Sequence, residues 1–113
     1  MNPALQAACQ AWLGGTPETA PERFRRASPI GWVADVRAPV WLNQGRNDTR
    51  TPPGQAQAYA DALREAGGDV LIEWFDGGHT IPGLDRALAD QKRMFELVDR
   101  RLRGLRWDEL ETP

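Results

Sequence analysis

Two short apolar segments, separated by an amphipathic one, constrain the fold of this 113-residue chain more than any other feature. Residues 39–45 (PVWLNQG) and 69–76 (DVLIEWFD) have the length and the flanking residues of buried strands. Between them, residues 54–68 carry apolar side chains at helical spacing and end at two glycines. A strand, a helix and a second strand in this order predict two parallel strands joined by a crossover.

Helical segments flank this unit on both sides. Residues 3–13 are rich in alanine and stop at two glycines, and residues 16–28 predict one or two short helical turns that end before Pro29. An irregular connector is expected over 31–38, and a long helix over 83–104. The apolar stripe of the long helix is expected to pack on the core; it consists of Leu84, Leu88, Gln91, Phe95, Val98 and Leu102.

The predicted order is therefore helix, strand, helix, strand, helix, in a single partial α/β domain. Residues 1–38 are expected to form a helical connector, residues 39–103 the strand–helix–strand–helix unit, and residues 104–113 a tail. Two strands make a poor sheet by themselves, because three or more are normally needed and both edges stay open. The sequence thus predicts the end of a larger parallel α/β sheet.

Composition excludes several classes of function. Apolar residues make up 41% and charged residues 27% of the chain, which is typical of a globular protein. The net charge of −2 gives no indication of a nucleic-acid partner. Cys9 is the only cysteine, so we expect no internal disulfide and a packing role for its side chain. With one histidine and one cysteine, neither a metal site nor another cofactor is expected.

No segment has the length of a membrane span, and the N-terminus lacks the pattern of a signal peptide. These observations predict a cytoplasmic protein without a membrane partner. The arginine-rich stretch DRRLRGLR lies at the end of the long helix, where cations complement the helix dipole.

Two candidate catalytic residues follow the two predicted strands. Asp48 comes three residues after Gly45, and His79, the only histidine, follows the second strand. The carboxyl ends of adjacent parallel strands lie about 5 Å apart, so the two side chains can meet. A carboxylate that holds one ring nitrogen orients an imidazole for general-base catalysis. The alternative is that Asp48 is a turn residue and His79 an exposed loop residue.

The stretch from residue 39 to residue 80 resembles the C-terminal part of an α/β-hydrolase catalytic domain of the prolyl-oligopeptidase type. That family includes dipeptidyl- and acylaminoacyl-peptidases and is related to dienelactone hydrolases. The resemblance covers roughly residues 10–103, since the connector WLGGTPETAPERFRRASPIGWVADVRAP is similar as well. The matching positions after the first strand, at the start of the helix and after the second strand are Gly45, Asp48, Pro52, Gln55, Asp76, Gly77, Gly78 and His79.

The resemblance implies that Asp48 is the acid and His79 the base of a catalytic triad. In this fold the nucleophile precedes both in the chain, on a G-x-S-x-G turn between a strand and a helix. No such motif occurs in the 113 residues, and Ser28, the only serine, precedes a proline without a strand before it. Cys9, Thr49 and Thr80 offer no such turn either. We therefore assign no nucleophile, and the oxyanion hole is expected outside this sequence too.

The leading hypothesis is the C-terminal segment of a serine hydrolase, a peptidase of prolyl-oligopeptidase type, that is inactive alone. It would act on a peptide or ester substrate only when the missing N-terminal half is supplied. The alternative is a non-catalytic truncated product that forms homo-oligomers through the exposed edge of strand 39–45. A third hypothesis is a binding module that uses the tryptophan side chains Trp12, Trp32, Trp41, Trp74 and Trp107. The sequence does not distinguish peptidase from esterase.

Overall fold

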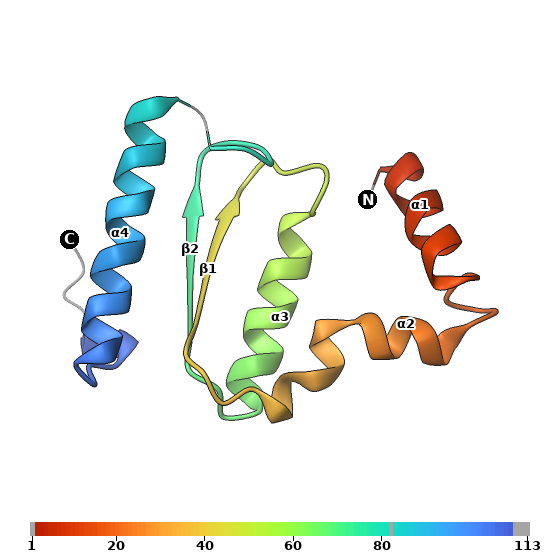
Figure 1. Cartoon of the computed structure of the whole chain (residues 1–113), viewed down its shortest axis with the longest axis horizontal. Helices are drawn as coiled ribbons and strands as arrows, with labels where there is room; N and C mark the ends of the chain where they lie inside the picture. Colours follow the sequence, from red (N-terminus) through yellow and green to blue (C-terminus); the bar gives the residue numbers. More distant parts are fainter. Residues whose placement is uncertain (1, 82, 110–113) are drawn as a thin grey trace.

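The computed structural model describes residues 2–81 and 83–109, and the last four residues of the predicted tail lie outside this part (Figure 1). Two parallel strands lie between helices, so the predicted mixed α/β architecture and its element order are confirmed. The elements are α1 (Pro3–Leu13), α2 (Pro21–Ala27), the 3-10 helix η1 (Pro29–Asp35), β1 (Val40–Gly45), α3 (Pro53–Glu65), β2 (Val70–Phe75), α4 (Leu84–Leu102) and the 3-10 helix η2 (Trp107–Glu109).

The two strands pair in parallel and in a regular register, from Val40 beside Val70 to Gly45 beside Phe75. Both strands consequently end at the same end of the sheet, where the arrowheads lie in Figure 1. Helix α3 covers one face of the sheet and α4 lies on the other side (Figure 1). Most strand residues are nevertheless half-buried, not buried as the apolar runs predicted, because this two-stranded sheet has an open edge beside each strand.

The best-packed part of the chain lies between α3 and the sheet. Ala60 and Leu63 of α3 are fully buried and contact Val70 of β2. Partly buried apolar side chains surround these three; they are Val33, Val36, Val40, Leu42, Tyr59 and Ile72. The connector before β1 was predicted to be irregular, and this was wrong, since η1 forms there. A proline at its start favours a helical turn, and packing of Val33 holds that turn on the core.

Helix α4 presents a different face to the sheet from the one its periodicity predicted. Its inner face makes polar contacts: Arg93 donates to Glu73 of β2 at 3.0 and 3.1 Å, and Asp90 accepts from Asn43 of β1. Leu97 is the buried apolar side chain of the helix. The predicted core stripe is instead exposed: Leu84 73%, Leu88 55%, Phe95 63%, Val98 50% and Leu102 83%, with Gln91 also exposed. Glu73 and Asn43 on the strands bind polar side chains of α4, so the face opposite to the apolar stripe packs on the sheet. Hydrophobic periodicity does not detect such polar partners.

Helices α1 and α2 extend away from the sheet on the side of α3 (Figure 1). Cys9 of α1 is half-buried and free, in line with its predicted packing role. Trp41 and Trp74 are half-buried within the strands, whereas Trp12 is 89% exposed. No helix among residues 2–81 and 83–109 is long and apolar enough to cross a membrane.

Candidate active site

Asp48 lies in a tight turn that follows β1. Its carboxylate oxygen Oδ1 accepts backbone N–H bonds from Arg50 and Thr51, each at 2.9 Å. The second oxygen, Oδ2, accepts the hydroxyl hydrogen of Thr51 at 2.6 Å. These are the local bonds typical of a turn aspartate. The side chain is nevertheless buried, with 7% of the residue exposed, so the turn holds a carboxylate away from bulk water.

The loop that carries His79 crosses directly over the end of β1. Arg46 donates its backbone N–H to Phe75 at 3.0 Å, and Asn47 donates to Gly77 at 2.9 Å. The crossing is close because Gly45 has no side chain: a Cβ there would lie 2.3 Å from the carbonyl oxygen of Gly78. A glycine at the end of β1 therefore allows the two loops to pack backbone against backbone.

This packing brings the predicted acid and base together. The Nδ1 atom of His79 lies 3.1 Å from Oδ2 of Asp48, which is hydrogen-bond distance. The His79 side chain is 44% exposed, whereas that of Asp48 is 5% exposed. The arrangement leaves one ring nitrogen facing a carboxylate and places the imidazole within reach of another molecule. Such a pair can orient a histidine for proton transfer.

The hydrogen bonds around Asp48 stabilise its ionised form. The Thr51 hydroxyl is the main cause that holds the pKa of Asp48 well below its usual range. Burial of the carboxylate opposes this effect, while the N–H of Thr51, the His79 ring and the N–H of Arg50 act in the same direction as the hydroxyl. A carboxylate that stays ionised can attract and orient an imidazole throughout the neutral pH range.

Gln44 and Thr51 are parts of the site that the sequence analysis did not single out. The Gln44 side chain donates to the backbone carbonyls of Gly45 and Thr51 at 3.1 and 3.2 Å, and lies 3.5 Å from Asp48 Oδ2. It thus ties the Asp48 turn to β1. A hydroxyl residue three positions after a turn aspartate was the available signal for Thr51, since Ser and Thr side chains are typical donors in such turns.

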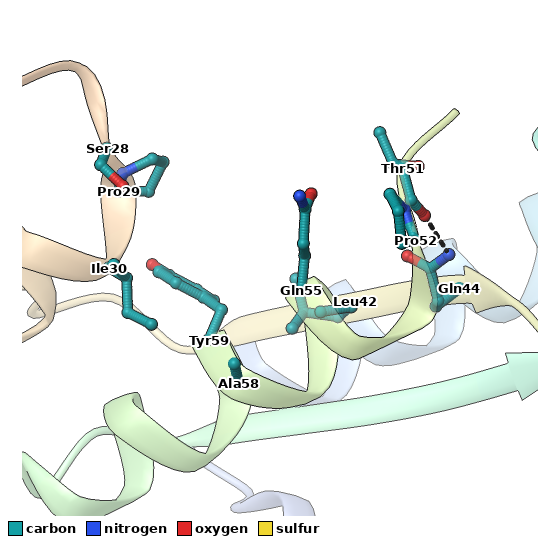
Figure 2. Close-up of a pocket in the computed structure, with 11 residues that line it drawn as sticks. Ser28, Pro29, Ile30, Leu42, Gln44, Thr51, Pro52, Gln55, Ala58 and Tyr59 are labelled. Atoms are coloured by element: carbon teal, nitrogen blue, oxygen red, sulfur yellow. Dashed lines mark hydrogen bonds between the residues drawn. The ribbon is translucent and has the colours of Figure 1, made fainter. Parts of the chain in front are cut away.

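A cavity of about 660 Å³ adjoins this turn on the α3 side of β1. Figure 2 shows Gln44 and Thr51 at one end of it, Gln55, Leu42 and Tyr59 along its length, and Ser28 with the start of η1 at the other end. Ser28 lies at that far end, opposite Thr51 (Figure 2). The structure therefore does not bring the only serine to the Asp48–His79 pair.

The other nucleophile candidates form no hydrogen bond with the pair in the described part of the chain. Cys9 lies within α1, which extends away from the sheet. Within the described residues, neither Thr49 nor Thr80 forms a hydrogen bond with His79. No group of three or more possible metal ligands occurs in that part of the chain. Acid and base are thus together, and the described residues place no serine or cysteine beside them.

The fold matches a segment of an α/β-hydrolase peptidase chain. A family model described as the prolyl oligopeptidase family matches residues 5–104. This chain belongs to the prolyl oligopeptidase family, and the resemblance drawn from the sequence motifs is confirmed.

Individual relatives agree with this assignment. Acylamino-acid-releasing enzyme 2 of rice (Oryza sativa subsp. japonica) is 41% identical over 59 residues, which is 51% of this chain and 8% of the enzyme. Esterase LipQ of Mycobacterium tuberculosis is 30% identical over 74 residues, 66% of this chain and 17% of the esterase. A solved acylaminoacyl peptidase in complex with Z-Gly-Gly-Phe-chloromethyl ketone matches with a TM-score of 0.60 at 25% identity, over 81% of this chain and 15% of the peptidase.

The chain spans less than a fifth of the length of these relatives. It is similar to one segment of each, and most of each relative has no counterpart in the 113 residues.

Proposed function

We propose that this chain supplies the acid and the base of a serine-hydrolase triad whose nucleophile lies on another segment or polypeptide. Asp48 is the acid and His79 the base. The observation that carries the proposal is the 3.1 Å contact between His79 Nδ1 and Asp48 Oδ2 at the ends of two parallel strands, in a chain of this family. Because the triad members act as a unit, the chain alone is expected to be inactive.

In the proposed reaction, ionised Asp48 accepts the Nδ1–H of His79, so that Nε2 carries the lone pair. Nε2 takes the proton from the serine hydroxyl as the serine oxygen bonds to the substrate carbonyl carbon. The imidazolium then gives this proton to the leaving amine or alcohol, and an acyl-enzyme remains. Water attacks the acyl-enzyme with His79 again as base, which releases the acid and restores the serine. Asp48 stays ionised throughout.

The free edge of β1 is the proposed docking position for the segment with the nucleophile. In the described part of the chain β1 pairs with β2 on one side alone, so its other edge can accept a further strand. Two hollows flank this strand, the one beside α3 described above and one of about 430 Å³ beside α4. Residues of β1 line both hollows and residues of β2 line neither, so side chains of an added layer can fill them on each face.

The substrate class follows from the chemistry and from the relatives. Acyl transfer through a serine serves amides and esters alike. Two of the relatives are an acylamino-acid-releasing enzyme and an acylaminoacyl peptidase, and another is an esterase. We therefore propose a peptidase that cleaves acylated or short peptides and also turns over activated esters.

The test is complementation of esterase LipQ shortened so that it lacks the segment similar to this chain. Mixing the two polypeptides with a p-nitrophenyl ester should give hydrolysis about 100-fold above the same mixture containing His79→Ala, the scale of a general base. Co-elution on size exclusion shows that the variant still binds. Equal rates for the wild-type chain and His79→Ala in co-eluting mixtures would refute the proposal.

The same free edge supports a second candidate, self-association without catalysis. A second copy can pair with β1 edge to edge, and the exposed apolar side chains of α4 favour association as well. Light scattering coupled to size exclusion distinguishes the two proposals. A stable monomer at micromolar concentration argues against edge pairing, whereas a dimer that the shortened esterase does not dissociate argues against complementation.

A further inference from the structure

The Thr51 hydroxyl contacts both predicted catalytic side chains. Its oxygen is 2.6 Å from Oδ2 of Asp48 and 3.5 Å from Nδ1 of His79. The same residue also donates its backbone N–H to Oδ1 of Asp48 at 2.9 Å. Thr51 therefore contacts both oxygens of the carboxylate, one through the main chain and one through the side chain, and this fixes the plane of the carboxylate toward the histidine.

The direction of the Thr51 hydrogen bond follows from counting protons. An ionised carboxylate is an acceptor at both oxygens, so the hydroxyl must be the donor in its bond to Asp48. The separation of 2.6 Å is that of an O–H bond to a charged oxygen. A hydroxyl has one hydrogen, and Thr51 donates it in the hydrogen bond to Asp48. The Thr51 oxygen consequently presents lone pairs alone to the histidine ring.

Two acceptors thus face Nδ1 of His79, the Asp48 carboxylate at 3.1 Å and the Thr51 oxygen at 3.5 Å. A neutral imidazole carries its hydrogen on one of its two nitrogens, and two acceptors beside Nδ1 favour the hydrogen there. Nε2 then carries the lone pair. This is the tautomer that a general base at Nε2 requires.

We propose that Thr51 is a positioning residue that fixes the tautomer of His79, holding the hydrogen on Nδ1 and the lone pair on Nε2. It does so by committing its hydroxyl hydrogen to Asp48 and locking the carboxylate in place. The low pKa of Asp48, caused chiefly by this hydroxyl, is in line with a permanently ionised acceptor. The catalytic consequence rests on the function proposed above, but the tautomer itself does not.

Gln44 is not equivalent to Thr51. Its amide nitrogen lies 3.5 Å from Asp48 Oδ2, the same separation as between the Thr51 oxygen and His79 Nδ1, and its shorter bonds go to the backbone carbonyls of Gly45 and Thr51. Figure 2 shows the bond to the Thr51 carbonyl. Gln44 therefore supports the backbone that carries Thr51, and within the described residues it forms no hydrogen bond with the His79 ring.

The test uses the single histidine of the chain. Nitrogen-15 NMR of the labelled chain alone, at a pH where the ring is neutral, identifies which ring nitrogen carries the hydrogen. The wild-type chain should show a protonated Nδ1 and an unprotonated Nε2. Thr51→Val keeps the shape and the backbone bond but removes the hydroxyl, and it should shift both nitrogen signals toward averaged values. Thr51→Ser should restore the wild-type pattern.

Asp48→Asn is the positive control for the nitrogen-15 signals of His79. The asparagine amide can present an N–H donor to Nδ1, and this favours the tautomer with the hydrogen on Nε2. If Thr51→Val unfolds the chain, judged by circular dichroism, Thr51→Ala against Thr51→Ser gives the same comparison. An unchanged Nδ1–H tautomer in a folded variant without the hydroxyl would overturn the inference.

Activity gives a separate readout in the mixture with the shortened esterase. There Thr51→Val should lower kcat roughly 10-fold with little change in KM, the scale of one hydrogen bond to a charged group. A tautomer that depends on Thr51, together with equal rates for the wild-type chain and His79→Ala in co-eluting mixtures, would refute the proposed function and leave this inference standing. If the tautomer does not change in Thr51→Val and the mixture is active, this inference is overturned and the proposed function stands.

Discussion

The two carboxylate oxygens of Asp48 have different partners, so a turn aspartate is compatible with the proposed role as catalytic acid. One carboxylate oxygen completes the turn through the N–H groups of Arg50 and Thr51. The other faces His79 and the Thr51 hydroxyl. The turn bonds hold the carboxylate in the orientation that the histidine needs. Local structure and the proposed chemistry therefore depend on the same side chain.

This leads to a prediction for the acid stability of the chain. The pKa of Asp48 is lowered in the folded state, so around and below its unfolded value of about 3.9 the folded chain binds fewer protons than the unfolded chain. The stabilisation by ionised Asp48 is present above that pH and is lost as the pH falls toward the folded pKa. In Asp48→Asn this contribution is absent at every pH.

The measurement is the midpoint of thermal unfolding between pH 7 and pH 2. The wild-type midpoint should fall more steeply below about pH 4 than that of Asp48→Asn. Asp61→Asn is the matched control, because Asp61 is an exposed helical carboxylate with side-chain bonds alone. Parallel curves for the wild type and Asp48→Asn would show that the turn does not depend on an ionised carboxylate.

Among the elements, the end of β1 decides how the two site loops meet. Gly45 is buried, and a Cβ there would lie within 2.7 Å of the carbonyl oxygens of both Gly77 and Gly78. Those atoms belong to the backbone of the loop that carries His79, and they cannot rotate away as a side chain can. The glycine is thus required by a contact between two loops.

Gly45→Ala should lower the free energy of unfolding by about 1–3 kcal/mol, because the added methyl group forces the His79 loop away. Gly54→Ala is the control: a Cβ at Gly54 meets no atom within 4 Å, so in the first turn of α3 alanine should be neutral or slightly stabilising. Urea denaturation measures both. Equal stability of the two variants would contradict the close crossing of the loops.

The second feature at the scale of the elements is which face of α4 packs on the sheet. Leu97 is 1% exposed and lines the hollow beside Trp41 of β1, whereas Phe95 of the exposed stripe is 63% exposed. Leu97→Ala should cost about 2–5 kcal/mol of unfolding free energy, and Phe95→Gln less than about 0.5 kcal/mol. Urea unfolding of the monomer at low concentration checks both values. The reverse order would show that α4 packs through the apolar stripe, as its periodicity predicted.

At the scale of the whole molecule, the sequence predicted the order of the elements and the meeting of Asp48 with His79. Both follow from local signals: apolar runs define the strands, and parallel strands end on the same side. What it did not predict depends on contacts between distant segments. The crossing at Gly45 and the rotation of α4 toward Glu73 are set by partners 20 or more residues away in the sequence. Periodicity identifies an apolar stripe, but it does not identify the surface that faces the sheet.

The central claim is that His79 becomes the base of an active site when the missing part of the domain is supplied. A peptidyl chloromethyl ketone tests it directly, since such a reagent alkylates a catalytic histidine with loss of chloride. His79 is the only histidine of the chain, so mass spectrometry locates the adduct without ambiguity. We predict rapid labelling of His79 in the mixture with the shortened esterase, slower labelling in Asp48→Asn, and background labelling of the chain alone. A co-eluting mixture in which His79 stays unlabelled would contradict the claim.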